Sequence, residues 1–242
     1  MPAEHGVGDG VGSAVLKRPL PHGWPGSVRP FGHLAVNGYV LHGAEPVLVE
    51  AGTVVGRDDF MQALCSVIDP ADLRWLWLTH PDPDHIGAIP QLLEEAPQLR
   101  IITTFLGMGS LNLFAPLPVD GVHFVNPGES IHLADRVLTG FRPPAFDNPV
   151  STGIVDDRTG ALFSSDFFGA LLPDIPERAD DLDGAALRDG QVRWASIDSP
   201  WLHTVDVEWL YDRPRNSTSK VLRSGGAVAD RCEPVAKSGG RW

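Results

Sequence analysis

One short segment, residues 79–87, constrains this chain more than any other part of its sequence. It reads Thr-His-Pro-Asp-Pro-Asp-His-Ile-Gly and follows residues 73–78, a nearly continuous apolar run typical of a strand covered on both faces. Two imidazoles and two carboxylates therefore stand within six positions: His80, Asp82, Asp84 and His85. Side chains of these types, gathered where a buried strand ends, predict a metal site.

The same segment has a plainer interpretation as an exposed turn. In that case Asp84 caps a helix whose inward face begins with Ile86 and Ile89 and which runs to about Glu95, while the prolines stiffen the loop. A capping turn does not require a histidine at each end, so we favour the metal site.

The rest of the chain alternates strands and helices. Apolar residues at helical spacing predict a helix over residues 60–68, and an acidic stretch at residues 174–189 is expected to form a solvated helix or loop. Short β-branched, turn-bounded segments predict strands at residues 33–41, 46–49, 73–78, 100–104, 122–125, 131–139, 152–156 and 161–164. This pattern is typical of a mixed α/β protein with layered sheets.

The motif at residues 79–87 resembles the metal motif of the metallo-β-lactamase superfamily, Thr-His-x-His-x-Asp-His-x-Gly, with Asp82 at the second histidine position. A carboxylate at that position resembles the flavodiiron and oxygen-binding di-iron branch, which usually carries Glu there. Residues 37–52 resemble the family's opening strands, although Glu50 stands where Asp is usual. The resemblance spans about residues 28–212 and implies an α/β (α+β) fold, the metallo-β-lactamase-like four-layer αβ/βα sandwich.

The resemblance also implies a ligand set. His80 and Asp82 correspond to ligands of one metal ion, and Asp84 and His85 to ligands of a second. Residues 162–166 resemble the strand that delivers a bridging aspartate, here Asp166, whose alternative role is a strand-end or helix-capping residue. A bridging carboxylate holds two cations close together and leaves a position for water, hydroxide or dioxygen. Asp84 is also the residue that we expect to act in catalysis.

Two histidines of the family have no direct counterpart. Where the third one is usual, Asp147 is the candidate ligand, and an Asx turn beside Pro149 is its alternative role. The last one falls near residues 221–227, which contain no histidine. His203 remains as a possible ligand, as a partner that orients a ligand, or as a surface residue. We expect the C-terminal part to have diverged or been truncated relative to other members of the family, leaving metal two short of a ligand.

Charge and composition exclude several classes of protein. With 19 basic and 31 acidic residues the formal charge is −12, which argues against nucleic acid as a partner. The N-terminus has no signal-like pattern, and the chain has no apolar stretch of about 18 residues, so we expect a cytoplasmic protein with no membrane association. The two cysteines, Cys65 and Cys232, lie far apart in sequence and fit a reducing compartment.

Composition also divides the chain into three parts. Residues 1–25, rich in Gly and Pro, are expected to form a loose N-terminal leader. Residues 26–212 are expected to form the metallo-β-lactamase-like domain. Residues 213–242 carry seven basic and two acidic residues among many Gly and Ser, and we expect this tail to be disordered.

The ligand set predicts which metal is bound. The carboxylates of Asp82, Asp84, Asp147 and Asp166 would balance two divalent cations, so less positive charge remains to acidify water than in a three-histidine site. Oxygen ligands favour iron over zinc, with manganese also possible. We therefore predict a dinuclear, preferably di-iron site with a dioxygen-binding or redox role.

The predicted partners follow from that role. They are dioxygen or another small-molecule substrate and an external reductase, because no segment after Arg213 resembles a flavin module and we expect no flavin site in this chain. The oligomeric state stays open. One alternative function is a hydrolase that attacks an ester, thioester or lactone with metal-bound hydroxide. The other is a degenerate, non-catalytic metal-binding scaffold.

Overall fold

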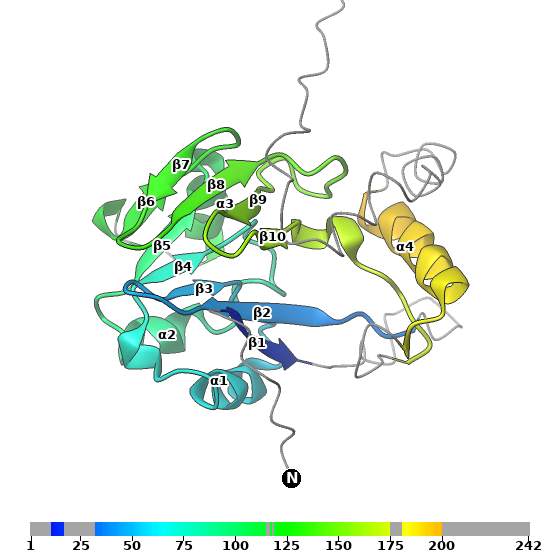
Figure 1. Cartoon of the computed structure of the whole chain (residues 1–242), viewed down its shortest axis with the longest axis horizontal. Coiled ribbons are helices and arrows are strands. Elements are labelled where there is room, and N and C mark those ends of the chain that lie inside the picture. Colours follow the sequence, from blue (N-terminus) through cyan, green and yellow to red (C-terminus); the bar gives the residue numbers. More distant parts are fainter. Residues whose placement is uncertain (1–10, 17–31, 115–116, 118, 175–180, 200–242) are drawn as a thin grey trace, which may run out of the picture.

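The structure is a computed structural model that describes residues 11–16, 32–114, 117, 119–174 and 181–199. Figure 1 shows two sheets, with helices α1 and α2 on the outer side of the first sheet and α4 beyond the β10 end of the second. The predictions for His203, for residues 221–227 and for the tail after residue 212 lie outside the described residues.

The first sheet has six strands in the order β1-β2-β3-β4-β5-β6. Its strands are β1 (Val11–Leu16), β2 (Val36–Leu41), β3 (Val47–Val49), β4 (Trp75–Trp77), β5 (Arg100–Thr103) and β6 (Val122–Phe124). The pairs β1–β2 and β2–β3 are antiparallel, whereas β3 to β6 run parallel. Parallel strands end at one edge, so the segments after β3 and β4 meet there.

Three helices cover one face of this sheet: α1 (Arg57–Cys65), α2 (Ile89–Glu95) and α3 (Phe105–Phe114). Phe60 and Leu64 of α1 are fully buried against Leu48 and Leu76 of the strands. This apolar layer anchors α1 and α2 beside the strands, because burying each such side chain contributes about 1.5–3 kcal/mol. Two short 3-10 helices, η1 (Pro70–Asp72) and η2 (Val119–Gly121), lie between elements of this half.

The second sheet is antiparallel throughout and has the order β10-β9-β8-β7. Its strands are β7 (Ser130–His132), β8 (Val137–Phe141), β9 (Gly153–Asp156) and β10 (Leu162–Phe163). A second apolar cluster joins the two sheets, with Val49 and Trp77 of the first packed with Leu138 and Ile154 of the second. The sheets therefore pack face to face, and their common edge can bring together side chains from both.

The chain leaves the second sheet through η3 (Ser165–Phe168) and continues to α4 (Gly184–Asp198). Helix α4 begins where the Asp183 carboxylate accepts a hydrogen bond from the Ala186 N–H, an N-cap that pairs an otherwise unsatisfied donor. None of the helices in the described residues has the length and apolar character that a bilayer span requires.

The two packed sheets with external helices confirm the predicted mixed α/β class, but four details differ from the predictions. Residues 131–139 form two strands, β7 and β8, joined by a turn. Helix α3 was not predicted. Residues 11–16 form β1, so the expectation of a loose leader is wrong for this segment, which pairs with β2. Helix α2 starts at Ile89 and not at Asp84.

The late start of α2 is explained by hydrogen bonds to a loop that is distant in sequence. The N–H groups of Gly87 and Ala88 donate to the carbonyls of Gly52 and Ala51, at 2.7 and 2.9 Å. These donors are thus occupied by the loop that follows β3. The backbone before Ile89 is held by that loop, and Asp84 keeps its carboxylate free of a capping role.

Candidate metal centre

The candidate metal centre lies where the loop after β4 meets the loop after β3. The two loops are joined by backbone hydrogen bonds, including Ala51 N–H to the His85 carbonyl at 2.8 Å. Gly87 allows their close approach, because a Cβ atom at this position would lie 2.2 Å from the carbonyl carbon of Thr53. Tight packing of these loops fixes the backbone from which His80 and His85 project.

His80 is fully buried and has a different environment on each side of its ring. Its Nδ1 lies 3.1 Å from the hydroxyl oxygen of Thr79 and 3.1 Å from that of Ser165. Its Nε2 lies 3.8 Å from one carboxylate oxygen of each of Asp82, Asp147 and Asp166. No hydrogen-bond partner reaches this buried Nε2 among the described residues.

His85 lies beside His80, with the two ring centroids 4.1 Å apart. Its Nδ1 lies 3.1 Å from Oε2 of the buried Glu50, whose other oxygen accepts a hydrogen bond from the Thr79 N–H at 3.1 Å. Its Nε2 lies 3.2 Å from Asp166 and 3.6 Å from Asp84. Glu50 therefore contacts the outer side of the His85 ring, and its backbone adopts a φ of 66° to do so.

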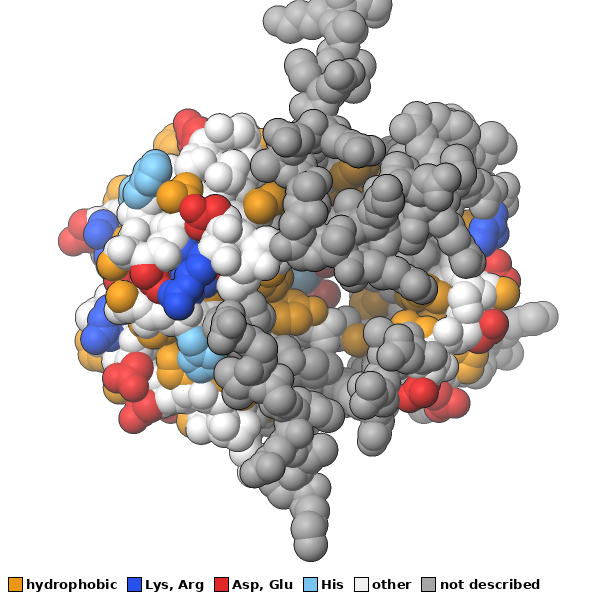
Figure 2. All heavy atoms as spheres, in the orientation of Figure 1, with side chains coloured by type: hydrophobic (Ala, Val, Ile, Leu, Met, Phe, Trp, Pro, Cys, Tyr) orange, Lys and Arg blue, Asp and Glu red, His pale blue; other side chains and the backbone are white. Residues whose placement is uncertain are grey.

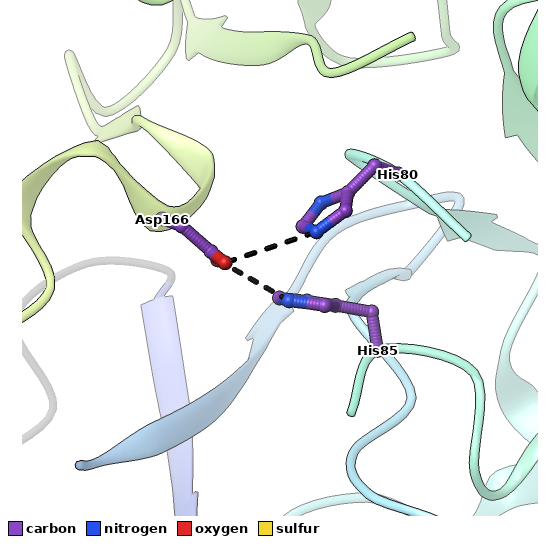
Figure 3. A group of neighbouring side chains, drawn as sticks. All are labelled: His80, His85 and Asp166. Carbon is purple, nitrogen blue, oxygen red and sulfur yellow. Dashed lines mark ion pairs between the residues drawn. The ribbon is translucent and has the colours of Figure 1, made fainter. Parts of the chain in front are cut away.

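Asp166 faces both histidines, as Figure 3 shows. Its Oδ2 is 3.8 Å from His80 Nε2, and its Oδ1 is 3.2 Å from His85 Nε2. The side chain comes from η3, immediately after Ser165, which has a left-handed φ of 56°. Each oxygen of one carboxylate thus faces a different imidazole.

Asp82 and Asp147 approach His80 from opposite parts of the chain and are linked through Asn148. The Asn148 side-chain amide donates to Asp82 Oδ1 at 2.9 Å, and its backbone N–H donates to Asp147 Oδ1 at 2.6 Å. The second oxygen of each aspartate is the one that faces His80. The Asx turn predicted for Asp147 is formed instead by Asn148, whose Oδ1 accepts a hydrogen bond from the Val150 N–H at 3.2 Å.

Asp198, the last residue of α4, also reaches this centre. One of its carboxylate oxygens lies within 4.8 Å of ligand atoms of both Asp147 and Asp166. The sequence did not single out Asp198, because no motif surrounds it and it follows Asp166 by more than 30 positions.

Burial and mutual repulsion change the acidity of two of these carboxyl groups. Burial raises the pKa of Asp198, and the charges of Asp166 and Asp147 raise it further, to about 8. Burial likewise raises the pKa of Asp147, and although the charge of His80 opposes the shift, the value reaches about 6. Without a cation, the centre therefore holds more negative charge than it can accommodate at neutral pH.

The pKa values of His85 and Asp166 both shift in the direction that favours the charged form. Burial lowers the pKa of His85, but the charges of Glu50 and Asp166 outweigh it and hold the pKa well above its ordinary value of 6.5. Burial raises the pKa of Asp166, but the nearby His85 and His80 rings bring it below its ordinary value of 3.8. In both cases the centre favours opposite charges side by side.

The residues present fit a pair of metal ions. Two ligands that each lie about 2.1 Å from one cation are at most about 4.2 Å apart. The spacings of 3.2 to 3.8 Å around the histidine Nε2 atoms satisfy this limit and are mostly too long for hydrogen bonds. Buried, unpartnered imidazole nitrogens that face carboxylates are the arrangement that a bound cation would satisfy.

A cavity of about 650 Å³ opens beside His85 and Asp166. Its polar end includes Glu50 and Asp84, and much of its wall is aromatic or aliphatic. The aromatic residues that line it are Tyr39, Phe163, Phe168 and Trp194. Figure 2 shows a hollow on one face of the molecule, with hydrophobic side chains on either side of it. The volume lies in the range of small-molecule sites, about 300–1,000 Å³.

The structure brings together six of the seven residues that the sequence singled out: His80, Asp82, Asp84, His85, Asp147 and Asp166. The seventh, His203, lies outside the described residues. Sequence reasoning missed the roles of Asn148, Ser165 and Asp198. Sequence reasoning noted Glu50 only because it stands where the family usually has Asp. The neighbours of Asn148 and Ser165 in sequence, Asp147 and Asp166, were the available signal.

Comparison with known proteins identifies the family of the chain. The model of the family described as "ODP family beta lactamase" matches residues 34–186, more than half of the 242 residues. Flavo-diiron protein FprA2 of Clostridium acetobutylicum is 29% identical over 136 residues, which are 55% of this chain and 34% of that protein. Nitric oxide reductase of Moorella thermoacetica is 22% identical over 209 residues, 85% of this chain and 52% of that protein.

Among solved structures, the chain resembles rubredoxin oxygen:oxidoreductase from Desulfovibrio gigas with a TM-score of 0.70. The sequences are 23% identical, and the match covers 79% of this chain and 48% of that chain. The likeness shows that both share the metallo-β-lactamase fold. The chain spans about a third of the length of the Clostridium protein and about half of that of the Moorella protein.

Proposed function

The chain belongs to the ODP family of beta lactamases, and from this membership and the geometry of its centre we propose that it is an oxidoreductase with a carboxylate-rich pair of metal ions. Iron is the preferred metal, with manganese or zinc as possible substitutes. Dioxygen or another small oxidised molecule is the proposed substrate.

A single observation carries this proposal. The two oxygens of Asp166 face Nε2 of His80 and Nε2 of His85 separately, as a carboxylate shared by two cations requires. His80 would hold one cation with Asp82 and Asp147. His85 would hold the other with Asp84. Both imidazoles lack a hydrogen-bond partner at Nε2 among the described residues, so the two cations would satisfy both.

The chain's own residues prepare the centre for such a pair. A bound pair of redox-active cations would supply electron transfer to a small-molecule substrate. Thr79, Ser165 and Glu50 contact the outer nitrogens of the two histidines and aim the inner ones at the centre. Burial of His80 and His85 keeps bulk water from the inner side of both rings.

The names of the relatives support the substrate class. They include a flavo-diiron protein, a nitric oxide reductase and a rubredoxin-oxygen oxidoreductase. Reduction of dioxygen or nitric oxide requires electrons. We propose that a separate reductase in the cytoplasm delivers them to this chain.

The proposal is tested by anaerobic purification, reconstitution with Fe(II) and elemental analysis, followed by oxygen uptake with a chemical reductant. We expect about two iron ions per chain and an absorbance band that changes when dioxygen is added. The Asp166→Asn variant should retain neither, because it removes the shared ligand. Its control is Asp189→Asn, an exposed aspartate on α4. A wild-type protein that remains metal-free after reconstitution contradicts the proposal and favours the non-catalytic scaffold.

The cavity favours a second candidate function. Its volume of about 650 Å³ greatly exceeds the space that a diatomic molecule needs, and its apolar wall ends at Asp84 and His85. An organic ester, thioester or lactone would fit there, with Asp84 beside the reacting group. Zinc retained in place of iron, together with turnover of an ester panel that Asp166→Asn abolishes, would establish this hydrolase in place of the oxidoreductase.

A further inference from the structure

One face of α4 packs on the segment after η3 and ends at the candidate metal centre. Gly190, Trp194 and Asp198 stand four residues apart, so they lie on the same face of the helix. Two of these residues contact the segment that follows η3. The third ends the helix at the centre.

Gly190 makes the first contact. A Cβ atom at this position would lie 2.5 Å from the carbonyl oxygen of Leu171, so the helix backbone packs directly on that segment. The Leu171 N–H donates to the Gly190 carbonyl at 3.1 Å, which ties the two backbones together. Only a residue without a side chain allows this approach.

Trp194 makes the second contact, one turn further along. Its Nε1 would lie 2.5 Å from a Cβ atom at Gly169, so the indole covers the backbone of that glycine. Gly169 follows Asp166 by three residues, and its N–H donates to the Asp166 carbonyl at 2.8 Å. The helix is therefore docked on the same short segment that delivers the Asp166 carboxylate.

One more turn brings Asp198 to the carboxylates of Asp147 and Asp166, with ligand atoms within 4.8 Å of one another. A cluster of acids alone does not establish a metal site. Here an independent feature points into the cluster: His80 Nε2 is fully buried, has no hydrogen-bond partner among the described residues, and lies 3.8 Å from both Asp147 and Asp166.

We propose that Asp198 is an inner-sphere ligand of the cation that Asp147 and Asp166 share, delivered by the docked face of α4. This inference rests on the proposed function, since it assumes that the centre binds metal. It adds a ligand to the cation that His80 would hold, and it is separate from the ligand that the second cation lacks near residues 221–227.

The added carboxylate changes the charge of the ligand set. The five aspartates of the centre are Asp82, Asp84, Asp147, Asp166 and Asp198. Their charge exceeds that of two divalent cations by about one and falls short of that of two trivalent cations by about one, so the ligand set stabilises cations of higher charge. Loss of Asp198 should therefore make a bound iron pair easier to reduce.

The experiment uses the full chain and Mn(II) alone as the probe. Metal-free wild type, Asp198→Ala, Asp198→Asn and Asp189→Asn are titrated anaerobically, and a crystal of the Mn(II)-loaded wild type is used to locate the ions by anomalous scattering. Asp189 is the matched control because it lies on the same helix and its side chain is 73% exposed. Alanine is compatible with a helix end, and circular dichroism checks that each variant is folded.

We expect wild type and Asp189→Asn to bind two Mn(II) ions, and Asp198→Ala to bind one of them at least about 100-fold more weakly, more than loss of an outer partner usually costs. An anomalous peak should lie within about 2.4 Å of an Asp198 oxygen. A smaller loss of affinity, or a peak farther away, overturns the inference and leaves the proposed function intact. A wild type that binds fewer than two ions overturns both. A variant that fails to fold leaves the decision to the wild-type crystal.

Discussion

The hydroxyl oxygen of Ser165 lies 3.1 Å from Nδ1 of His80. The residue before Asp166 thus holds the ring of one histidine, while Asp166 itself faces both. Thr79 Oγ1 completes a triangle, 3.0 Å from the Ser165 hydroxyl and 3.1 Å from the same nitrogen. The orientation of His80 and the position of Asp166 are therefore set by one turn of η3.

Replacing Ser165 by Ala should weaken metal binding about 10-fold, because loss of a partner that orients a ligand typically costs 10–100-fold and Thr79 remains in place. Titration with Mn(II) measures the effect. Ser164→Ala is the control, since the Ser164 side chain makes no capping hydrogen bond to η3. Equal affinities of the two variants would show that Ser165 does not orient His80.

Replacing Glu50 by Gln should reduce affinity for one cation by roughly 10–100-fold, because the charge beside His85 Nδ1 is lost. The Thr79 N–H can still donate to the remaining amide oxygen, so the loop should stay in place. Glu94→Gln, an exposed change on α2, serves as the control. Unchanged Mn(II) affinity in the Glu50 variant argues against its positioning role.

The metal-free protein should lose stability as pH rises from about 5 to about 8. The pKa of Asp198 is about 8 in the folded chain against an ordinary value of 3.8, and the pKa of His85 is also raised. The folded state then binds more protons than the unfolded state in this range, so the free energy of unfolding falls with rising pH.

Urea unfolding in the presence of a chelator measures this dependence. Asp198→Asn should make it less steep above about pH 6, since the amide does not ionise while His85 still does, whereas Asp189→Asn should leave it unchanged. A free energy of unfolding that rises with pH over this interval is the opposite of the expected result.

Replacing Asp82 by His should shift metal selectivity from iron towards zinc, because an imidazole replaces an anionic oxygen ligand. In the wild-type chain, the Asn148 side-chain amide donates to one Asp82 oxygen, and the other oxygen faces His80. Competition between Fe(II) and Zn(II), followed by elemental analysis, measures the ratio bound. Unchanged selectivity would mean that Asp82 does not contact the metal.

Two glycine substitutions should affect stability in opposite directions. Gly87→Ala should lower the free energy of unfolding by about 1–3 kcal/mol, because its Cβ would collide with the Thr53 backbone at 2.2 Å. Gly109→Ala on α3 should raise it by about 0.5–1 kcal/mol, since that site has no atom within 4 Å of the added carbon. If urea unfolding gives the same change in the free energy of unfolding for both variants, the close packing at Gly87 does not exclude a side chain there.

The part of the centre that the sequence predicted lies in one motif or follows a recognisable strand. His80 and His85 were predicted because four potential ligands lie close together in sequence. Asp166 was predicted because the segment before it resembles the family's strand. Asp198 could not be read in this way. It reaches the centre only through the docking of α4 on the backbone of Gly169 and Leu171, a contact that leaves no local pattern.

The same distinction holds for the fold. Strands and helices with one buried face were predicted because their apolar residues repeat at the right period. Helix α3 was not predicted, because its apolar residues are not confined to one face. Phe105, Leu106 and Leu113 are exposed, whereas Leu111 is buried. The start of α2 was placed too early because hydrogen bonds to the distant loop after β3 decide it.

The two sheets contribute to the centre from opposite halves of the chain. The loop after β4 supplies His80 and His85, and the segments beside β8 and β10 supply Asp147 and Asp166. During synthesis, a chain that has emerged only as far as the first sheet carries its histidines without their bridging partner. If the proposed centre binds its metal pair, complete loading would follow completion of the second sheet, unlike in a zinc finger, whose ligands are all within one short stretch. A cation in this centre would also link the two sheets, and its removal would weaken their packing first at the edge where they meet.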